Sequence, residues 1–171
     1  VPTLCSYTLD SQTVVAAEGI VMRVILRDMY ENVIGPEVQY DVTTSVDGTL
    51  NTTLAMNETT LEYVGSVSTT LAKDYQAAFF VNGVLLLPHR DLLVVPGPPN
   101  FSNTDFNVTS GALAAGDHVN YTMVLRDDFR NVIWSPNGVV FFFGESELGP
   151  AVLADGSLFV SYRATLVGEF E

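Results

Sequence analysis

The sequence predicts an all-β protein built from two β-sandwiches in tandem. Three observations predict this fold class. A nine-residue motif recurs about one domain length later, apolar and polar side chains alternate with a period of two, and tight-turn dipeptides follow at short intervals. The sequence shows no convincing helix.

The recurring motif reads LRDMYENVI at residues 26–34 and LRDDFRNVI at residues 125–133, with six of nine positions identical at a spacing of 99 residues. This spacing exceeds the roughly 20–50 residues of solenoid repeats. It matches the length of an immunoglobulin-like sandwich, about 100 residues. The sequence therefore predicts two tandem immunoglobulin-like β-sandwiches, over residues 1–97 and 98–171.

Alternating polarity places the strands. One strand over residues 118–126 carries four apolar residues on its inner face: Val119, Tyr121, Met123 and Leu125. The equivalent strand of the first copy carries Ile20, Met22, Val24 and Leu26. Further strands are expected over residues 38–42, 61–69, 75–81, 84–87, 92–95, 139–143 and 158–162. Dipeptides that tolerate positive φ predict tight turns at Asp47-Gly48, Asn82-Gly83, Asn137-Gly138 and Asp155-Gly156.

Composition excludes several classes of function. The formal net charge is −13, from 20 acidic and seven basic residues, so the chain lacks the cationic footprint that nucleic acids and anionic membranes require. The apolar runs are too short to span a bilayer as a helix. Cys5 is the single cysteine and cannot form an internal disulfide. It either pairs outside this segment or, as we favour, packs in the first strand as a small hydrophobe.

Motifs around the repeat resemble filamin-type immunoglobulin-like repeats. The second copy carries Ala114-Ala115-Gly116-Asp117, the LRDDFRNVI motif, then Asp155-Gly156 and Gly168-Glu169-Phe170, in the order typical of that family. The first copy departs from the pattern at Lys73, where a glycine is usual. The resemblance implies partner peptides that add a strand to the groove between the third and fourth strands.

The second copy is shorter than the first at its end. Residues 169–171 align with the entry to the sixth strand of the first copy, so its last two strands are missing. Such a sandwich exposes an open edge and half of its core. We expect either that the chain is an excerpt of a longer tandem array or that the completing strand comes from elsewhere.

The repeated motif contains candidate turn-structuring residues: Asp28, Asn32, Asp127 and Asn131. Their side chains bond nearby backbone groups and tolerate left-handed conformations, so we expect them to build the turn after the second strand. A calcium site is the alternative, but the motif lacks a full set of carboxylates at ligand spacing. Tyr30 and Phe129 are expected to pack over the end of each sandwich.

The sequence shows no catalytic signature. It lacks Gly-x-Ser-x-Gly, phosphate loops and metal-ligand spacing around its two histidines, His89 and His118. We therefore expect no enzyme activity, no cofactor and no metal.

Asn-x-Ser/Thr triplets are over-represented, with five present where about 1.6 are expected by chance. The candidate N-glycosylation residues are Asn51, Asn57, Asn100, Asn107 and Asn120. Alternation places Asn107 and Asn120 on outer strand faces, as a surface glycan requires. The alternative is that Asn and Thr are simply common on exposed β-faces. Asn100 follows the stiff linker of residues 96–99 and is occluded if the domains pack closely.

Two functions follow. The first is a non-enzymatic structural or adhesion glycoprotein that is extracellular or at the cell surface. It would act as a rod, spacer or filament component. It would bind other protein chains, or further repeats of the same protein, by strand addition. The apolar stretch Val139, Val140, Phe141, Phe142 and Phe143 is then a candidate partner edge. That stretch equally suits a central strand covered on both faces, which we favour slightly. The second function is a cytoplasmic filamin-like scaffold that binds partner peptides.

Overall fold

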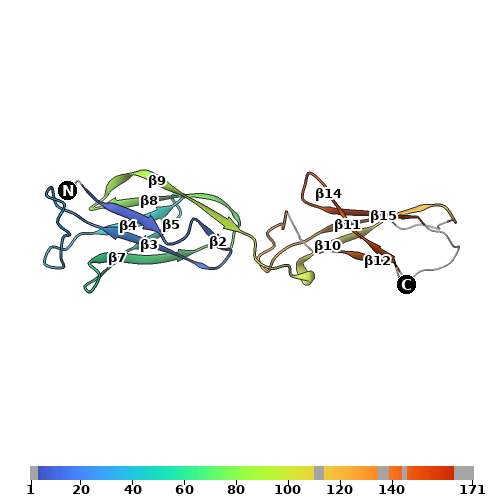
Figure 1. The fold of residues 1–171 in the computed structure, drawn as a ribbon, viewed down its shortest axis with the longest axis horizontal. Coiled ribbons are helices and arrows are strands. Elements are labelled where there is room, and N and C mark those ends of the chain that lie inside the picture. The colour runs from blue at the N-terminus through green and yellow to red at the C-terminus, as the bar shows by residue number, and fades with distance from the viewer. Residues whose placement is uncertain (1–3, 110–113, 135–138, 144–145, 164–171) are drawn as a thin grey trace. The chain divides into compact units, whose positions relative to one another are not determined.

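The computed structural model describes residues 4–109, 114–134, 139–143 and 146–163. The chain forms two compact units, Val1–Val95 and Pro96–Glu171. The described residues are nearly all β-strand or turn, with a single 3₁₀ turn, η1 (Phe101–Asn103). Figure 1 shows sheets in each unit, which confirms the predicted all-β class.

The first unit is a sandwich of two sheets. One sheet has the order β1 (Ser6–Leu9), β3 (Gly19–Ile25), β7 (Glu62–Ser68) and β6 (Ala55–Asn57). The other has the order β2 (Thr13–Val15), β9 (Val84–Val95), β8 (Lys73–Val81), β4 (Val42–Val46) and β5 (Leu50–Thr53). The two sheets pack face to face, and alternate side chains of each strand point into the space between them, as in immunoglobulin-like domains.

Alternate side chains of each sheet fill the core of the first unit. On β3, Ile20, Met22 and Val24 are at most 1% exposed, which confirms the inner face predicted from the sequence. On β8, Ala77 and Phe79 are fully buried and face them from the second sheet. Burying these apolar faces provides the main stabilisation of the unit.

The second unit repeats the first sheet of the first unit strand by strand. Its larger sheet has the order β10 (Asp105–Val108), β11 (His118–Val124), β15 (Leu158–Arg163) and β14 (Ala151–Val152). A separate hairpin joins β12 (Phe141–Phe143) and β13 (Ser146–Leu148), at the place in the chain that β4 and β5 occupy in the first unit.

The structure corrects several expected strand boundaries. The third strand of the first unit begins, not ends, at Val42, because residues 36–41 form turn and coil. Residues 84–87 and 92–95 belong to one continuous strand, β9. The short strand β2 pairs in parallel with β9 and was not expected. Of the expected turns and repeat residues, Asn137-Gly138 and Gly168-Glu169-Phe170 lie outside the described residues.

Tight turns have the positive φ angles that their dipeptides predicted. Asn82 and Gly83, between β8 and β9, have φ angles of 48° and 75°. Asp47 and Gly48, between β4 and β5, have φ angles of 48° and 71°. Consecutive left-handed residues give a hairpin turn whose twist matches the twist of its strands.

Replacing Gly83 by alanine is expected to destabilise the first unit by about 1 kcal/mol, because a Cβ is strained at positive φ. The matched control is Gly19→Ala. An added Cβ meets no atom within 4 Å at either glycine, but Gly19 has no positive φ. Chemical denaturation followed by far-UV circular dichroism measures both variants. Equal stability of the two variants would contradict the backbone explanation.

Candidate functional site

The repeated motif forms a carboxylate-anchored turn in the second unit. Asp127 is fully buried, and its Oδ1 accepts hydrogen bonds from the backbone N–H groups of Phe129 (2.9 Å) and Asn131 (2.8 Å). Its Oδ2 accepts from the side-chain Nδ2 of Asn131 (2.8 Å) and from the backbone N–H of Gly97 (2.9 Å). One carboxylate therefore fixes both the turn after β11 and the start of the unit.

The same turn in the first unit is more open. Asp28 Oδ1 accepts from the N–H groups of Tyr30 (2.8 Å) and Asn32 (2.9 Å), and its Oδ2 accepts from Asn32 Nδ2 (3.0 Å). In both units these N–H donors occupy the carboxylate oxygens that a calcium ion would need. No group of three or more His, Cys, Asp or Glu residues that could hold a metal occurs in the described part of the chain.

The aromatic residue within each turn does not pack over the end of its sandwich as expected. Tyr30 is 75% exposed and Phe129 is 44% exposed. The reason is local: each turn lies past the end of β3 or β11 and beyond an isolated bridge, Arg27–Val33 or Arg126–Val132. The core position at the end of the strand belongs to Leu26 and Leu125, each 1% exposed.

Asp127 is ionised in the folded protein. Burial opposes its ionisation, but hydrogen bonds from the Asn131 side chain and from the backbone of Gly97, Asn131 and Phe129 outweigh it, so the pKa of Asp127 lies below its ordinary value. The pKa of Asp28 is also lowered, chiefly by the Asn32 side chain. Both turns are therefore built on charged carboxylates at neutral pH.

The five candidate glycosylation residues differ in accessibility. Asn51 on β5 and Asn107 on β10 are exposed. Asn57 is exposed, and its Oδ1 accepts from the N–H groups of Thr59 and Thr60. Asn120 on β11 is half-buried. Asn100 is also half-buried and caps η1.

Asn100 differs from the other four asparagines because both the oxygen and the nitrogen of its side-chain amide make hydrogen bonds. Its Oδ1 accepts from the N–H of Ser102 at 2.8 Å, and its Nδ2 donates to Asp128 Oδ1 at 2.6 Å. A glycan is attached through this nitrogen, so a sugar there would displace the contact with Asp128.

The candidate partner edge coincides with β12 and the residues before it. Val140 is 40% exposed and Phe142 is 66% exposed, whereas Val139 and Phe141 are half-buried. Within the described ranges β12 pairs with β13 alone. The assignment of this stretch as a partner edge or as a central strand stays a prediction. The Phe143 side chain lies outside the description.

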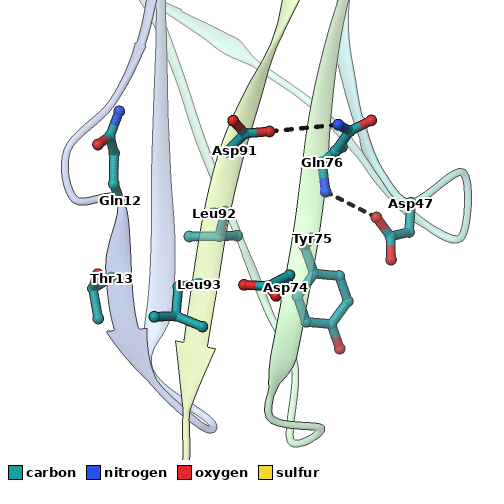
Figure 2. Close-up of a pocket in the computed structure, with 9 residues that line it drawn as sticks. All are labelled: Gln12, Thr13, Asp47, Asp74, Tyr75, Gln76, Asp91, Leu92 and Leu93. Atoms are coloured by element: carbon teal, nitrogen blue, oxygen red, sulfur yellow. Dashed lines mark hydrogen bonds between the residues drawn. The ribbon is translucent and has the colours of Figure 1, made fainter.

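The first unit also has an acidic groove of about 540 Å³ on the outer face of its second sheet. Figure 2 shows its nine lining residues, which include the carboxylates of Asp47, Asp74 and Asp91. Gln76 donates from its backbone N–H to Asp47 (2.9 Å) and from its Nε2 to Asp91 (3.4 Å). Lys73 pairs with Asp47 at 2.7 Å, and this hydrogen bond lowers the pKa of Asp47.

The groove offers carboxylate, amide and hydroxyl groups for hydrogen bonding. Its lining holds neither a nucleophile beside a base nor a histidine. Sequence reasoning missed it because its residues come from four separate segments. The available signal was the outward alternation of Asp74 and Gln76 along β8.

Cys5 is half-buried, and burial raises the pKa of its thiol above the ordinary value. This environment suits a packed small side chain rather than a reactive thiolate.

Among the described residues, the structure contains no helix that is long and apolar enough to cross a membrane.

Comparison with known proteins yields similarity in structure alone. No family model and no curated protein sequence matches the chain. The Escherichia coli adhesin FdeC superposes with a TM-score of 0.62 at 13% identity, over 94% of this chain and 55% of that one. Invasin, a bacterial integrin-binding protein, superposes with a TM-score of 0.62 at 12% identity, over 91% of this chain and 33% of that one.

These likenesses show the fold. The chain is built of all-β, immunoglobulin-like domains like those of bacterial adhesins, and it spans about half the length of FdeC and a third of invasin. The filamin-type subclass that the motifs resemble stays a prediction.

Replacing Asp127 by alanine is expected to destabilise the second unit by about 2–3 kcal/mol, because it leaves buried N–H donors without an acceptor. The matched variant is Asp28→Ala in the first unit, which should cost less because its turn is more exposed, and far-UV circular dichroism measures it. Trp134, the single tryptophan, lies in the second unit, so its fluorescence during urea denaturation reports on that unit. An Asp127→Ala transition at the wild-type midpoint would contradict the anchoring role.

The stability of the second unit should depend on the charge of Asp127. Because its folded-state pKa lies below the ordinary 3.8, its contribution is present above that pH and is lost as the pH falls through the folded pKa. The stability gap between wild type and Asp127→Asn should therefore stay constant above about pH 5 and narrow as the pH falls below that value. Trp134 fluorescence measures both proteins, and a constant gap would show that the charge contributes nothing.

Proposed function

We propose that the chain is a non-enzymatic segment of an extracellular or cell-surface structural or adhesion glycoprotein. Its repeats, over residues 1–97 and 98–171, serve as a rod, spacer or filament component. The observation that carries the proposal is the immunoglobulin-like fold shared with two adhesins over more than nine-tenths of the chain. Such modules position binding surfaces away from their point of attachment, and they need no catalytic site.

The glycosylation candidates support the location outside the cytoplasm. Asn51, Asn57 and Asn107 are exposed, so a sugar attached there would not enter a core. The net charge of −13 suits a secreted surface that must stay dispersed.

Partner binding in this proposal uses sheet edges. β5 and β12 each present one backbone edge among the described strands, and Phe142 beside the second edge is 66% exposed. An added strand gains main-chain hydrogen bonds from the edge and side-chain contacts from the exposed phenylalanine. The partners are other protein chains, including further repeats of the same kind.

A cytoplasmic filamin-like scaffold is the second candidate. The repeated LRD-x-aromatic motif and its resemblance to filamin-type repeats favour it. Both candidates share the strand-addition mode, and they differ in whether the protein passes through the secretory route.

Glycopeptide mass spectrometry on native protein separates the two. We expect sugar on Asn51 and Asn107, which are exposed, and the lowest occupancy at Asn100, whose nitrogen binds Asp128. Recombinant protein from a host that lacks N-glycosylation is the control. Five unmodified asparagines in native material would contradict the extracellular proposal and favour the cytoplasmic scaffold.

A further inference from the structure

Trp134 is the single tryptophan of the chain, and it follows directly on the repeated motif of the second unit. In the first unit the residue after the motif is Gly35, so the large aromatic side chain belongs to the second unit alone. Trp134 is 57% exposed, although tryptophan is among the most buried side chains on average. Strand pairing does not require an exposed indole at this position.

The indole lies flat on the backbone of Gly156, in the turn between β14 and β15. A Cβ added at Gly156 would meet three consecutive ring atoms of Trp134: Cε3 at 2.8 Å, Cδ2 at 3.1 Å and Cζ3 at 3.3 Å. An approach in the plane of the ring would leave the two neighbours of Cε3 clearly farther away, so the face of the ring lies against the glycine. Gly156 is accordingly buried, whereas residues 151–155 before it are exposed.

The turn holds the indole with one face covered and the other free. Two backbone hydrogen bonds close the turn, from the N–H of Leu153 to the carbonyl of Ser157 (2.8 Å) and from the N–H of Gly156 to the carbonyl of Leu153 (3.0 Å). Gly156 has a φ of 80°, which favours glycine, and a larger side chain there would displace the ring. The free face of the indole is therefore positioned before any ligand arrives.

A fixed carboxylate belongs to the same turn. Asp155 Oδ1 accepts hydrogen bonds from the N–H (2.9 Å) and the hydroxyl (2.6 Å) of Ser157, and these bonds lower the pKa of Asp155. They do not use its second oxygen, Oδ2. Leu153, on the other side of the turn, is 43% exposed and adds apolar surface. We call the surface of Trp134, Leu153 and Asp155 the indole platform.

We propose that the indole platform binds a neutral hexopyranose, one sugar unit of a glycan. A hexopyranose such as a β-galactoside has C–H groups on one face, and their partial positive charge is attracted to the electron-rich face of an indole. The hydroxyl groups at the rim of the sugar donate charge-assisted hydrogen bonds to a carboxylate, here Asp155. An apolar surface with a few placed polar groups is the usual composition of a small-molecule site.

Charge and size restrict the class of ligand. The formal net charge of −13 and the carboxylate of Asp155 repel anionic sugars, so the ligand is a neutral one. A stable protein interface covers roughly 800 Å² on each partner. The free face of one indole with Leu153 beside it matches a single sugar ring instead.

This inference goes beyond strand addition, which uses the backbone edges of the sheets. It also does not depend on whether the chain itself is glycosylated. The first unit serves as an internal comparison, because Gly35 and Leu61 stand there at the positions of Trp134 and Gly156. Sugar binding is therefore confined to the second unit.

The test uses the whole chain, produced in a host that lacks N-glycosylation, with lactose as the probe. The fluorescence of Trp134 reports on this ring alone, since the chain has no other tryptophan. Lactose should shift the emission to shorter wavelength in a saturable way, with a Kd in the millimolar range. Sialyllactose, which adds a carboxylate to the same sugar units, should bind at least about fivefold more weakly at low ionic strength.

Variants followed by saturation-transfer difference NMR of the sugar assign the site. Trp134→Ala should abolish the lactose signal, and Asp155→Asn should weaken binding about 3–10-fold while keeping an oxygen for Ser157. Gly156→Ala should lose binding because its Cβ displaces the indole. The matched control is Gly116→Ala, also at a positive φ (102°), where the added Cβ would meet Arg163 at 3.6 Å rather than Trp134.

Far-UV circular dichroism shows whether each variant is folded, and Asp155→Asn tests the site even where Gly156→Ala does not fold. An unchanged Trp134 emission and no NMR transfer with lactose would overturn the proposal. So would equal losses in Gly156→Ala and Gly116→Ala, or equal affinities for lactose and sialyllactose. A shift with N-acetyl-phenylalanine amide but not with lactose would show that the occupant is an apolar protein surface.

Discussion

Both units depend on one constraint, namely that a sheet with one apolar face needs a second layer against it. In the first unit β8 provides that layer at its centre. Phe79 is fully buried between the two sheets and contacts Tyr7, while β8 bonds to β4 and β9 on its two edges. In the second unit the corresponding sheet is present, and Phe106, which pairs with Met123 as Tyr7 pairs with Val24, is 57% exposed.

Strand register explains why the repeat has two spacings. Paired positions on β1 and β3 recur 99 residues later, whereas those on β7 recur 95 residues later. A slip of one residue in a strand would turn its apolar face to solvent. The register between paired strands is therefore fixed. The connections carry no such constraint and absorb the four-residue difference. Leu61 and Gly156, which precede β7 and β15, accordingly share a positive φ.

Local alternation and turn chemistry made much of the fold predictable. The buried positions of Ile20, Met22 and Val24 could be predicted because a strand of seven residues is long enough to show a period of two. The parallel strand β2 could not be predicted from the sequence. Its three residues are too few to show a period, and its partner, β9, lies about 80 residues away.

The site was less predictable, since it depends on what lies opposite each side chain. The exposed positions of Tyr30 and Phe129 illustrate this limit: an aromatic residue in a turn is buried only if another layer reaches it. By contrast, Asp28 and Asp127 each accept hydrogen bonds from groups within four residues, which local sequence can reveal, whereas the bond from Gly97 to Asp127 spans 30 residues.

Glycans and partner strands would use different surfaces of the second unit. Asn107 lies opposite Thr122 in the β10–β11 register, and Asn120 is two residues further along the same face. Phe106 and Tyr121, whose ring centroids lie 6.0 Å apart, are on the opposite face of the same two strands. In the first unit, Asn51 instead lies on the edge strand β5, where a sugar would hinder an incoming strand. β13 has no Asn-x-Ser/Thr triplet, so glycosylation would not hinder a strand that adds there.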